Sequence, residues 1–200
     1  MARARQTDLV LLRHGLTDWN EAGRIQGRSD RLLSEDGRAR VRDWRIPPAF
    51  RDYHWVTSPL RRARETAALL GHEEAEIVPE LIEADWGAWE GQRLDELRAR
   101  LGATMAAMEW RGLDFRPPGG ESPRDLQGRL APWLARVADG RDPCIAVTHK
   151  GVMRALYALA AGWDLRGSPP AKLRPDCAHR FRLASGGGLA VARLNLALLP

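Results

Sequence analysis

The chain has 200 residues, of which 44% are hydrophobic and 28% are charged, and this composition is typical of one soluble globular domain. No apolar run reaches the roughly 18 residues that a membrane span needs, and the basic N-terminus lacks the apolar segment of a secretory signal, so we expect a cytoplasmic protein without a membrane partner. The net charge is +5, but only Lys150 and Lys172 are lysines and the arginines are scattered, which favours a small anionic substrate over a nucleic acid.

The first predicted element is a buried strand at residues 9–12, where four consecutive apolar residues precede Arg13, His14 and Gly15. Ligands of α/β proteins bind outside the carboxyl ends of the strands. Gly15 lets the chain turn and lets a ligand approach the backbone closely. We therefore predict that His14 is the reactive group of an enzyme that acts on phosphate groups.

The next segment, residues 16–30, is predicted to be a long ordered loop, and loops of this length in compact domains are usually functional. A short helix follows from an N-cap at Ser34 to about Trp44. The elements after it are a strand at 53–57, a helix that Ser58 caps and Gly71 closes, and a short strand at 76–79.

The middle of the chain, residues 84–120, contains helical patterns at 93–101 and 103–110 and is predicted to form a small cap or lid over the sheet. No linker or repeat interrupts the chain, so we expect residues 1–200 to form a single domain. Ser122 then caps a longer helix, which Pro132 is expected to kink or divide.

A second buried strand is predicted at 144–148, and it ends on His149 before a helix at 152–161. Two strands at 178–183 and 189–196, joined at 185–188, form a predicted antiparallel hairpin at the sheet edge. Because strands alternate with helices before this hairpin, the pattern predicts an α/β fold with a mainly parallel sheet. The two cysteines, at 144 and 177, are predicted to be free and buried, and no ligand-spaced cluster suggests a metal.

Five residues stand out as candidates for chemistry, and most of them follow a predicted strand or begin a predicted helix: Arg13, His14, Arg61, Glu83 and His149. Such positions converge at one rim of a parallel sheet, where arginine forks and helix N-termini hold phosphate oxygens. A neutral, oriented histidine serves as a nucleophile, and a carboxyl group beside the leaving oxygen serves as general acid. Arg62 and Arg64 are predicted to face solvent, and Trp86 and Trp89 to pack rather than bind substrate.

The combination of motifs resembles the histidine phosphatase superfamily, the phosphoglycerate mutase-like proteins, over nearly the whole chain. The motifs that carry the resemblance are Leu11-Leu12-Arg13-His14-Gly15-x-Thr17-x-Trp19-Asn20, Gln26-Gly27 with Asp30, Leu33-Ser34-x-x-Gly37, Thr57-Ser58-Pro59-Leu60-Arg61-Arg62-Ala63-x-Glu65-Thr66-Ala67, Glu83-x-x-x-Gly87-x-Trp89-Glu90-Gly91, Pro118-Gly119-Gly120-Glu121-Ser122 and Val147-Thr148-His149-x-Gly151-Val152-x-Arg154.

This resemblance implies a three-layer α/β/α fold with a mainly parallel mixed sheet and a role for each matched residue. It implies that His14 becomes phosphohistidine and that Glu83 exchanges protons with the leaving alcohol and with water. It implies that the phosphoryl oxygens are held by Arg13, Arg61 and His149. It also implies that the phosphate and substrate side is lined by Asn20, Gln26 and Gly27. It implies no metal and no cofactor.

Two positions depart from the pattern of the family. Leu16 stands where many members have Glu, which removes a charge near the mouth of the site and is expected to change substrate preference. Lys150 stands where Gly is common, and it either adds a cation at the rim or points to solvent.

The activity predicted from these residues and from the resemblance is that of a metal-independent phosphomonoesterase, a phosphatase of the histidine acid type, acting on a small phosphorylated metabolite through phosphohistidine. One alternative is a cofactor-dependent phosphoglycerate mutase, although mutases of the family are longer after the general acid. The other is a non-catalytic module that docks phosphorylated ligands, and the joint presence of His14, Glu83 and His149 argues against it.

Overall fold

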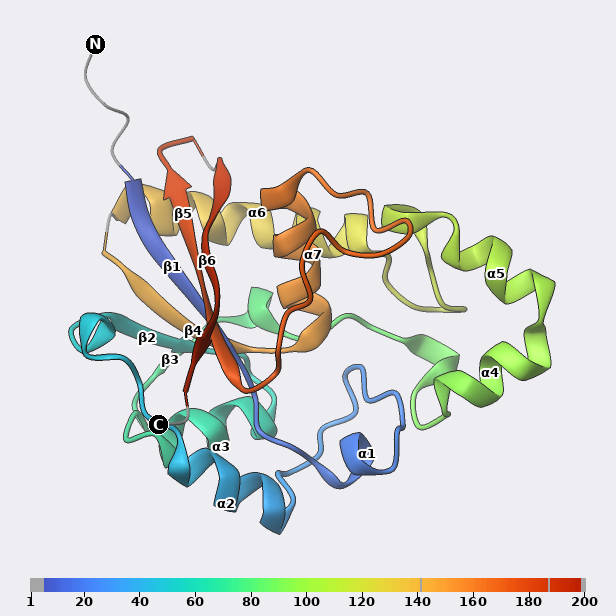
Figure 1. Cartoon of the computed structure of the whole chain (residues 1–200), viewed down its shortest axis with the longest axis horizontal. Coiled ribbons are helices and arrows are strands. Elements are labelled where there is room, and N and C mark those ends of the chain that lie inside the picture. Colours follow the sequence, from blue (N-terminus) through green and yellow to red (C-terminus); the bar gives the residue numbers. More distant parts are fainter. Residues whose placement is uncertain (1–5, 141, 187, 199–200) are drawn as a thin grey trace.

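The computed structural model describes residues 6–140, 142–186 and 188–198. Its centre is a six-stranded sheet with the strand order β3-β2-β4-β1-β5-β6 (Figure 1). The strands are β1 Gln6–Arg13, β2 His54–Thr57, β3 Glu76–Ile77, β4 Cys144–Thr148, β5 Cys177–Ala184 and β6 Leu189–Ala197. Strands β3, β2, β4 and β1 pair in parallel, whereas β5 pairs antiparallel with β1 and with β6. The predicted mainly parallel sheet and C-terminal hairpin are confirmed, and the turn residue Gly187 lies outside the described residues.

Strand β1 shows why the sheet is covered on both faces. Its residues alternate in direction, so Leu9 and Leu11 belong to one hydrophobic core, and Val10 and Leu12 to another. The first core is shared with α6 (Pro123–Gly140) and α7 (Lys150–Ala161), and the second with α2 (Glu35–Asp43) and α3 (Arg61–Leu69). Figure 1 shows these helix pairs on opposite sides of the sheet, which confirms the predicted three layers.

Local sequence signals set the ends of several elements. The Ser34 hydroxyl accepts a hydrogen bond from the Gly37 amide at 3.1 Å and caps α2 as predicted. The expectation that Ser58 caps the next helix is wrong, because α3 begins at Arg61 with Leu60 as its N-cap. Of the two outcomes expected at Pro132, a kink or a division, the division is excluded, because α6 runs unbroken from 123 to 140.

Residues 16–30, which are predicted to form a loop throughout, include the short helix α1, Asp18–Glu21. Thr17 and Asn20 close its first turn with a reciprocal pair of hydrogen bonds between side chain and backbone. Short 3-10 turns lie at Pro48–Phe50, Pro79–Leu81, Gly87–Trp89 and Gly112–Asp114.

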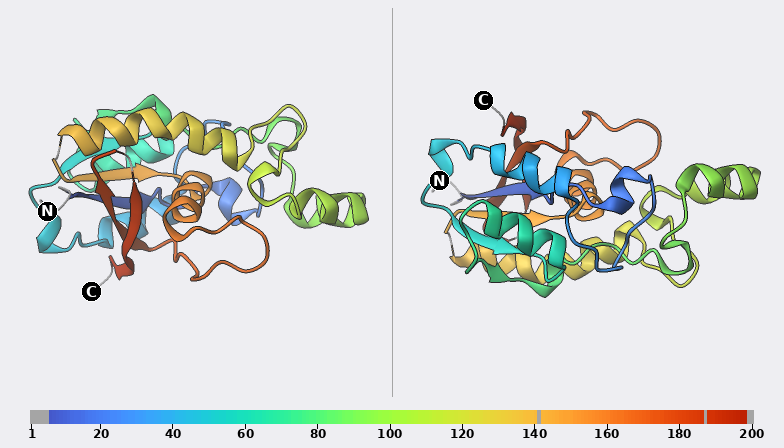
Figure 2. Two further views of the ribbon diagram at one scale, coloured as in Figure 1. Left: turned by 90° about the horizontal axis from the view of Figure 1, so that it is seen from above. Right: turned by 90° about the horizontal axis from the view of Figure 1, so that it is seen from below.

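The middle block projects beyond one end of the sheet and carries α4 (Leu94–Leu101) and α5 (Ala103–Glu109), as Figure 2 shows. It has a small core of its own, formed by the buried residues Trp89, Leu97 and Met105. The packing predicted for Trp89 is confirmed by this core, and Trp86 packs against it but also lines a cavity described below.

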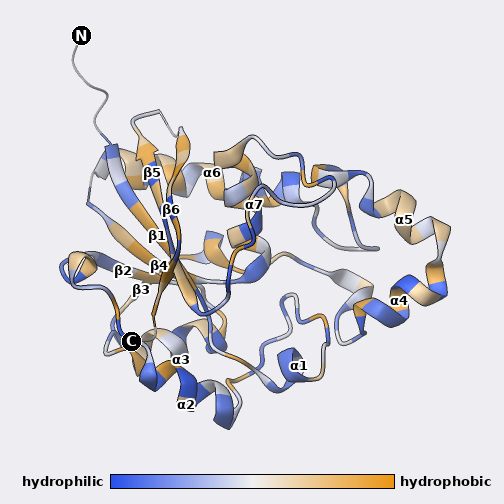
Figure 3. Cartoon of the chain, in the orientation of Figure 1, coloured by the Kyte–Doolittle hydropathy of each residue, from blue (hydrophilic) through white to orange (hydrophobic). Residues whose placement is uncertain are grey.

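Hydropathy follows this layout. In Figure 3 the strands are largely hydrophobic, whereas α2, which lies on the outside, is largely hydrophilic. Cys144 and Cys177 are buried and unpaired, as predicted. Across 6–140, 142–186 and 188–198, the structure contains no helix with the length and apolar character required for a membrane crossing.

Candidate active site

The two histidines that follow β1 and β4 lie side by side. These strands are parallel neighbours with Arg13 opposite Thr148, and the His14 amide donates to the Thr148 carbonyl at 3.0 Å. The register therefore fixes the residues that follow each strand at the same sheet edge. The imidazole rings of His14 and His149 lie 5.1 Å apart between centroids, and both side chains are buried.

The hydrogen bonds of His14 determine which of its nitrogens is free to react. Its Nδ1 lies 2.7 Å from the Gly15 carbonyl oxygen, and because a carbonyl only accepts, Nδ1 carries the hydrogen. Burial, together with the positive charges of Arg13 and Arg62, holds the pKa of His14 well below its ordinary value. The ring is therefore neutral near pH 7, with the lone pair on Nε2, as a nucleophile requires.

The arginine beside His14 is Arg62 and not Arg61. Arg62 is only 1% exposed, and its Nε donates to His14 Nε2 at 3.3 Å, whereas Arg61 is exposed. The prediction that Arg62 faces solvent is wrong, and Arg62 occupies the place in the site that we expected Arg61 to take. The reason is the phase of α3: its buried face carries residue 62 together with Ala63 and Ala67, so residue 61 points outward.

A neighbouring loop holds the guanidinium of Arg62. Its two terminal nitrogens donate to the carbonyls of Gly27 at 2.8 Å and Ser29 at 2.9 Å. Glu90 in turn accepts from the Ser29 amide at 2.8 Å and from the Ser29 hydroxyl at 2.6 Å. Gly27 has φ +53°, and a Cβ there would stand 1.9 Å from a Glu90 oxygen. Glu90 thus positions the loop, the loop positions Arg62, and Arg62 faces His14.

Glu83, the predicted proton donor, is buried and held at both carboxylate oxygens. Its Oε1 accepts from the Ala84 amide at 2.8 Å and its Oε2 from the Gly151 amide, in the first turn of α7, at 2.9 Å. Just before it in the chain, the Leu81 carbonyl accepts from the Thr148 hydroxyl of β4 at 3.0 Å. The carboxyl group is therefore fixed relative to the strand end that carries the second histidine.

Arg129 of α6 braces the same segment, and its role was not evident from the sequence. Its guanidinium donates to the Ile82 carbonyl at 3.0 Å and more weakly to that of Glu83 at 3.5 Å. Two bonds, of 2.9 and 3.0 Å, join it to the carboxylate of Glu121. Arg129 therefore pairs the Ile82 carbonyl and shares the Glu83 carbonyl with Arg28, whose Nε donates to it at 3.3 Å.

Several polar atoms of the site are buried without a partner. Within the described ranges there are four such side-chain atoms, and three of them belong to predicted site residues: Arg13 Nε, Gln26 Oε1 and His149 Nδ1. The other ring nitrogen of His149, Nε2, lies 2.6 Å from the Ser58 hydroxyl. Buried polar groups are normally paired, so these atoms indicate a place where a polar ligand binds.

The other residues predicted to bind substrate, Asn20 and Gly27, belong to the segment 16–30. Asn20 uses its side-chain oxygen to accept from the Thr17 amide at 3.2 Å, which leaves its amide nitrogen for other contacts. Gly27 contributes its carbonyl to Arg62. Among the residues that the structure describes, no group of three or more acidic, histidine or cysteine side chains is arranged to bind a metal ion.

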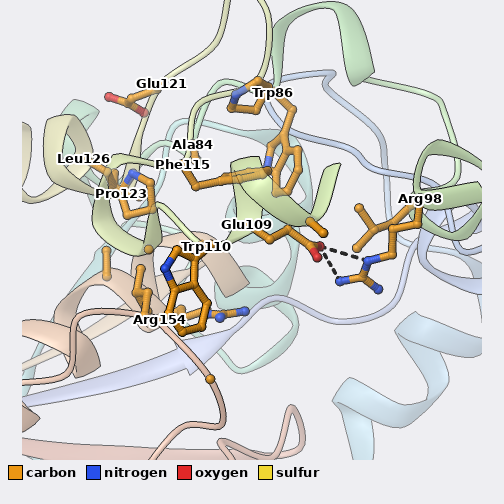
Figure 4. Close-up of a pocket in the computed structure, with 18 residues that line it drawn as sticks. Ala84, Trp86, Arg98, Glu109, Trp110, Phe115, Glu121, Pro123, Leu126 and Arg154 are labelled. Carbon is orange, nitrogen blue, oxygen red and sulfur yellow. Dashed lines mark hydrogen bonds and ion pairs between the residues drawn. The ribbon is translucent and has the colours of Figure 1, made fainter. Parts of the chain in front are cut away.

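A cavity of about 510 Å³ adjoins the site, and Figure 4 shows part of its lining. Ala84 and Gly151, which hold the Glu83 carboxylate, form part of its wall. The other lining residues come mainly from the middle block, α7 and the loop after it, and include Trp86, Trp110, Phe115, Arg98, Glu109 and Arg154. The cavity therefore borders the two residues whose backbone amides hold the Glu83 carboxylate.

Sequence comparison places the chain among known enzymes. The profile of the histidine phosphatase superfamily (branch 1) matches residues 9–196. The chain is 37% identical over 190 residues to a glucosyl-3-phosphoglycerate phosphatase of Mycobacterium tuberculosis, with 82% of this chain and 81% of the relative covered. It is 34% identical over 195 residues to a 2,3-bisphosphoglycerate-dependent phosphoglycerate mutase of Methylobacterium radiotolerans, with 88% and 89% covered.

A third relative is the metal-independent phosphoserine phosphatase of Arabidopsis thaliana, 34% identical over 160 residues, with 76% of this chain and 67% of the relative covered. Among solved structures, the mycobacterial glucosyl-3-phosphoglycerate phosphatase in complex with VO3 superimposes with a TM-score of 0.76 at 27% identity, covering 97% of this chain and all of that one. Phosphatases and mutases therefore both occur among the relatives.

Proposed function

The chain belongs to the histidine phosphatase superfamily, and on that premise we propose that it is a phosphomonoesterase that hydrolyses a small phosphorylated metabolite through phosphohistidine at His14. The observation that carries the proposal is the state of this ring. Its Nδ1 donates to the Gly15 carbonyl, and its unprotonated Nε2 accepts a hydrogen bond of 3.3 Å from the buried guanidinium of Arg62. A neutral nucleophile and a cation for the phosphoryl oxygens thus meet at one point.

In the first step, the Nε2 lone pair of His14 forms a bond to phosphorus while the bond to the leaving oxygen breaks. Protonated Glu83 gives its proton to that oxygen, so a neutral alcohol departs. Arg13, Arg62 and His149 Nδ1 bind the phosphoryl oxygens, where negative charge must be stabilised. Phosphoryl transfer depends mainly on such positioning and charge, and here guanidinium groups supply the positive charge.

In the second step, water attacks phosphorus and Glu83, now a carboxylate, accepts the proton of that water. The bond between phosphorus and His14 Nε2 breaks, its electron pair returns to the nitrogen, and inorganic phosphate leaves. The two backbone amides that hold Glu83 keep one carboxyl group in place for both transfers.

A mutase differs only in the acceptor, because a second substrate hydroxyl takes the phosphoryl group instead of water. The mutase relative makes this the alternative function. We favour hydrolysis because two of the relatives described above are phosphatases and because the middle block of this chain is modest, with two short helices. A cytoplasmic location and a single domain with residues 84–120 as its cap belong to the same proposal.

The decisive experiment labels the enzyme with a ³²P-phosphomonoester, stops the reaction with alkali and measures protein-bound label beside phosphate release. Wild-type protein is expected to carry a label that acid removes, as a phosphoramidate does, and His14→Ala to carry none. His54→Ala is the matched control, because His54 is exposed and pairs with Glu76. Label on His14→Ala contradicts the nucleophile, and transfer to 3-phosphoglycerate without free phosphate contradicts the hydrolase.

A further inference from the structure

We propose that three side chains act as positioning residues for the general acid Glu83: Arg28, Glu121 and Arg129. They form an ion-paired bridge between the segment that carries Glu83 and the loop that holds Arg62. The bridge acts through the backbone of both segments and not through the phosphoryl group. The inference rests on the proposed phosphatase function, and it identifies residues on which both proton transfers at Glu83 depend.

Glu83 needs support from outside its own segment, because residues 83–86 belong to no helix or strand. Among the residues that the structure describes, no backbone amide donates a hydrogen bond to the carbonyl of Ile82 or Glu83. Arginine side chains do so instead: Arg129 donates to Ile82 at 3.0 Å, and Arg28 donates to Glu83 at 3.3 Å. Arg28 also pairs with Asp85 at 3.6 Å. Two arginines from distant parts of the chain thus support this segment in the way that neighbouring strands support a strand.

Glu121 joins the two arginines into one bridge. Its carboxylate accepts two hydrogen bonds from Arg129, at 2.9 and 3.0 Å, and one from Arg28 at 3.4 Å. The side chain of Glu121 is only 13% exposed, so solvent screens these ion pairs weakly. Loss of the carboxylate leaves two guanidinium groups without the charge between them, and loss of Arg129 leaves a largely buried carboxylate with only its longer contact to Arg28.

Arg28 connects this bridge to the phosphate side of the site. It lies between Gly27 and Ser29, whose carbonyls accept hydrogen bonds from the Arg62 guanidinium. The backbone of Arg28 therefore belongs to the loop that holds Arg62, while its side chain contacts the carbonyl of Glu83. The separation between the phosphate-binding guanidinium and the general acid thus depends on the bridge.

This separation matters for both chemical steps. Of the two amides that bind the carboxylate, that of Ala84 belongs to the same segment as Glu83 and moves with it, whereas that of Gly151 belongs to α7. The position of the segment as a whole therefore depends on contacts from outside, such as those of the bridge. A shift of about 1 Å can cost about 10² in rate, and here it would misplace the carboxyl group for the leaving oxygen and for the attacking water.

The test uses 4-nitrophenyl phosphate, for which the two steps depend differently on Glu83. Nitrophenolate leaves without a proton, so kcat/KM, which reports the steps up to phosphorylation of His14, does not need the general acid. Attack of water on phosphohistidine still needs the base. The rate of this second step is measured by labelling the enzyme with the ³²P ester, adding excess unlabelled ester and following the loss of protein-bound label by rapid quench.

We expect Arg129→Gln and Glu121→Gln each to slow the loss of label about tenfold or more, with kcat/KM within about twofold of the wild type. Arg124→Gln is the matched control, because Arg124 also lies on α6 and forms an ion pair, with Asp114 at 2.7 and 3.0 Å, but on an exposed surface. It is expected to retain both rates. Circular dichroism checks the folding of each variant, and Arg28→Gln, whose side chain is more exposed, decides the test with the same expected result if the other two do not fold.

Two results would overturn the inference. One is a loss of label at the wild-type rate in the bridge variants. The other is an equal fall in the loss of label and in kcat/KM, because a merely structural role affects both steps alike. The proposed function fails in a different way: a wild type that carries no label refutes phosphohistidine, whereas a labelled wild type with unchanged rates in the variants refutes only the bridge.

Discussion

Substituting Arg61 and Arg62 one at a time removes the same charge from two adjacent positions, yet we expect very different losses of activity. Arg62→Ala deletes a buried guanidinium that donates to His14 Nε2 and to two loop carbonyls. Arg61→Ala deletes an exposed side chain, and the hydrogen bond of its backbone amide to Asp30, at 2.8 Å, does not depend on the side chain.

The size of the effect follows from what Arg62 does at the reacting centre. Removing one preorganised donor from a developing negative charge costs about 10² to 10³ in kcat. The alanine variant also leaves the Gly27 and Ser29 carbonyls unpaired, which lets the loop move away from the site. We therefore expect kcat/KM to fall by about 10³ for Arg62→Ala and by no more than about twofold for Arg61→Ala, because an exposed charge is screened by solvent.

The assay is steady-state hydrolysis of 4-nitrophenyl phosphate, with circular dichroism as a check that each variant folds. Arg62→Lys separates charge from geometry, because lysine keeps the charge but lacks the planar fork, and we expect it to lie between the wild type and Arg62→Ala. Equal losses for the two alanine variants, or a larger loss for Arg61→Ala, would refute the assignment of Arg62 to the phosphoryl group.

Three further predictions follow from the same geometry. Because the pKa of His14 lies well below 6.5, kcat/KM should retain its neutral-pH value down to pH 6.5, and a fall in kcat/KM that begins above this pH contradicts a neutral nucleophile. Below pH 6.5 His14 and His149 become protonated in the unfolded chain but stay neutral in the folded protein. The free energy of unfolding of the unliganded protein should therefore decrease by about 1.4 kcal/mol per pH unit for each of these two histidines. Glu83→Gln should lower kcat by about 10² to 10⁴ for alkyl phosphates and less for aryl phosphates, whose leaving groups need no proton, and equal losses argue against a general acid. Glu90→Gln and Ser29→Ala should each reduce kcat, and their double variant should lose less than the two losses combined, because both act through one loop; additive losses would show that they do not.

The placement of the two histidines could be predicted because it depends on local signals. Apolar runs identify β1 and β4 as buried strands, and parallel pairing then puts His14 and His149 at one edge. The cap at Ser34 and the buried glutamate at 83 were likewise found from neighbouring residues or from a family motif. Such features need no knowledge of which distant segments meet.

The exchange of Arg61 for Arg62 shows what local signals leave open. Ser58 and Pro59 suggest that α3 begins two residues earlier than it does. Which side of α3 is buried depends on how the helix packs against the sheet, and the local sequence does not determine this packing. The bond between Glu90 and Ser29 joins residues 61 apart in sequence, and that between Arg129 and Glu83 residues 46 apart. No pattern within one sequence reports such contacts, because they are fixed by the packed fold.

The residues to which we assign the reaction and the middle block that lines most of the cavity lie in different parts of the structure, and Glu83 lies where they meet. His14 and His149 lie at the sheet edge and Arg62 on α3, elements that share the two large cores, whereas α4 and α5 pack on a small core of their own. Changes in α4 and α5 can therefore reshape the cavity without moving His14 or Arg62, whereas Glu90 of the same block positions the loop that holds Arg62. They cannot be wholly independent of the chemistry, because Ala84 at the start of that block holds one oxygen of Glu83 and Gly151 of α7 holds the other. A substrate that contacts both the cavity walls and α7 therefore touches the two elements, the start of the middle block and α7, that position the Glu83 carboxyl group.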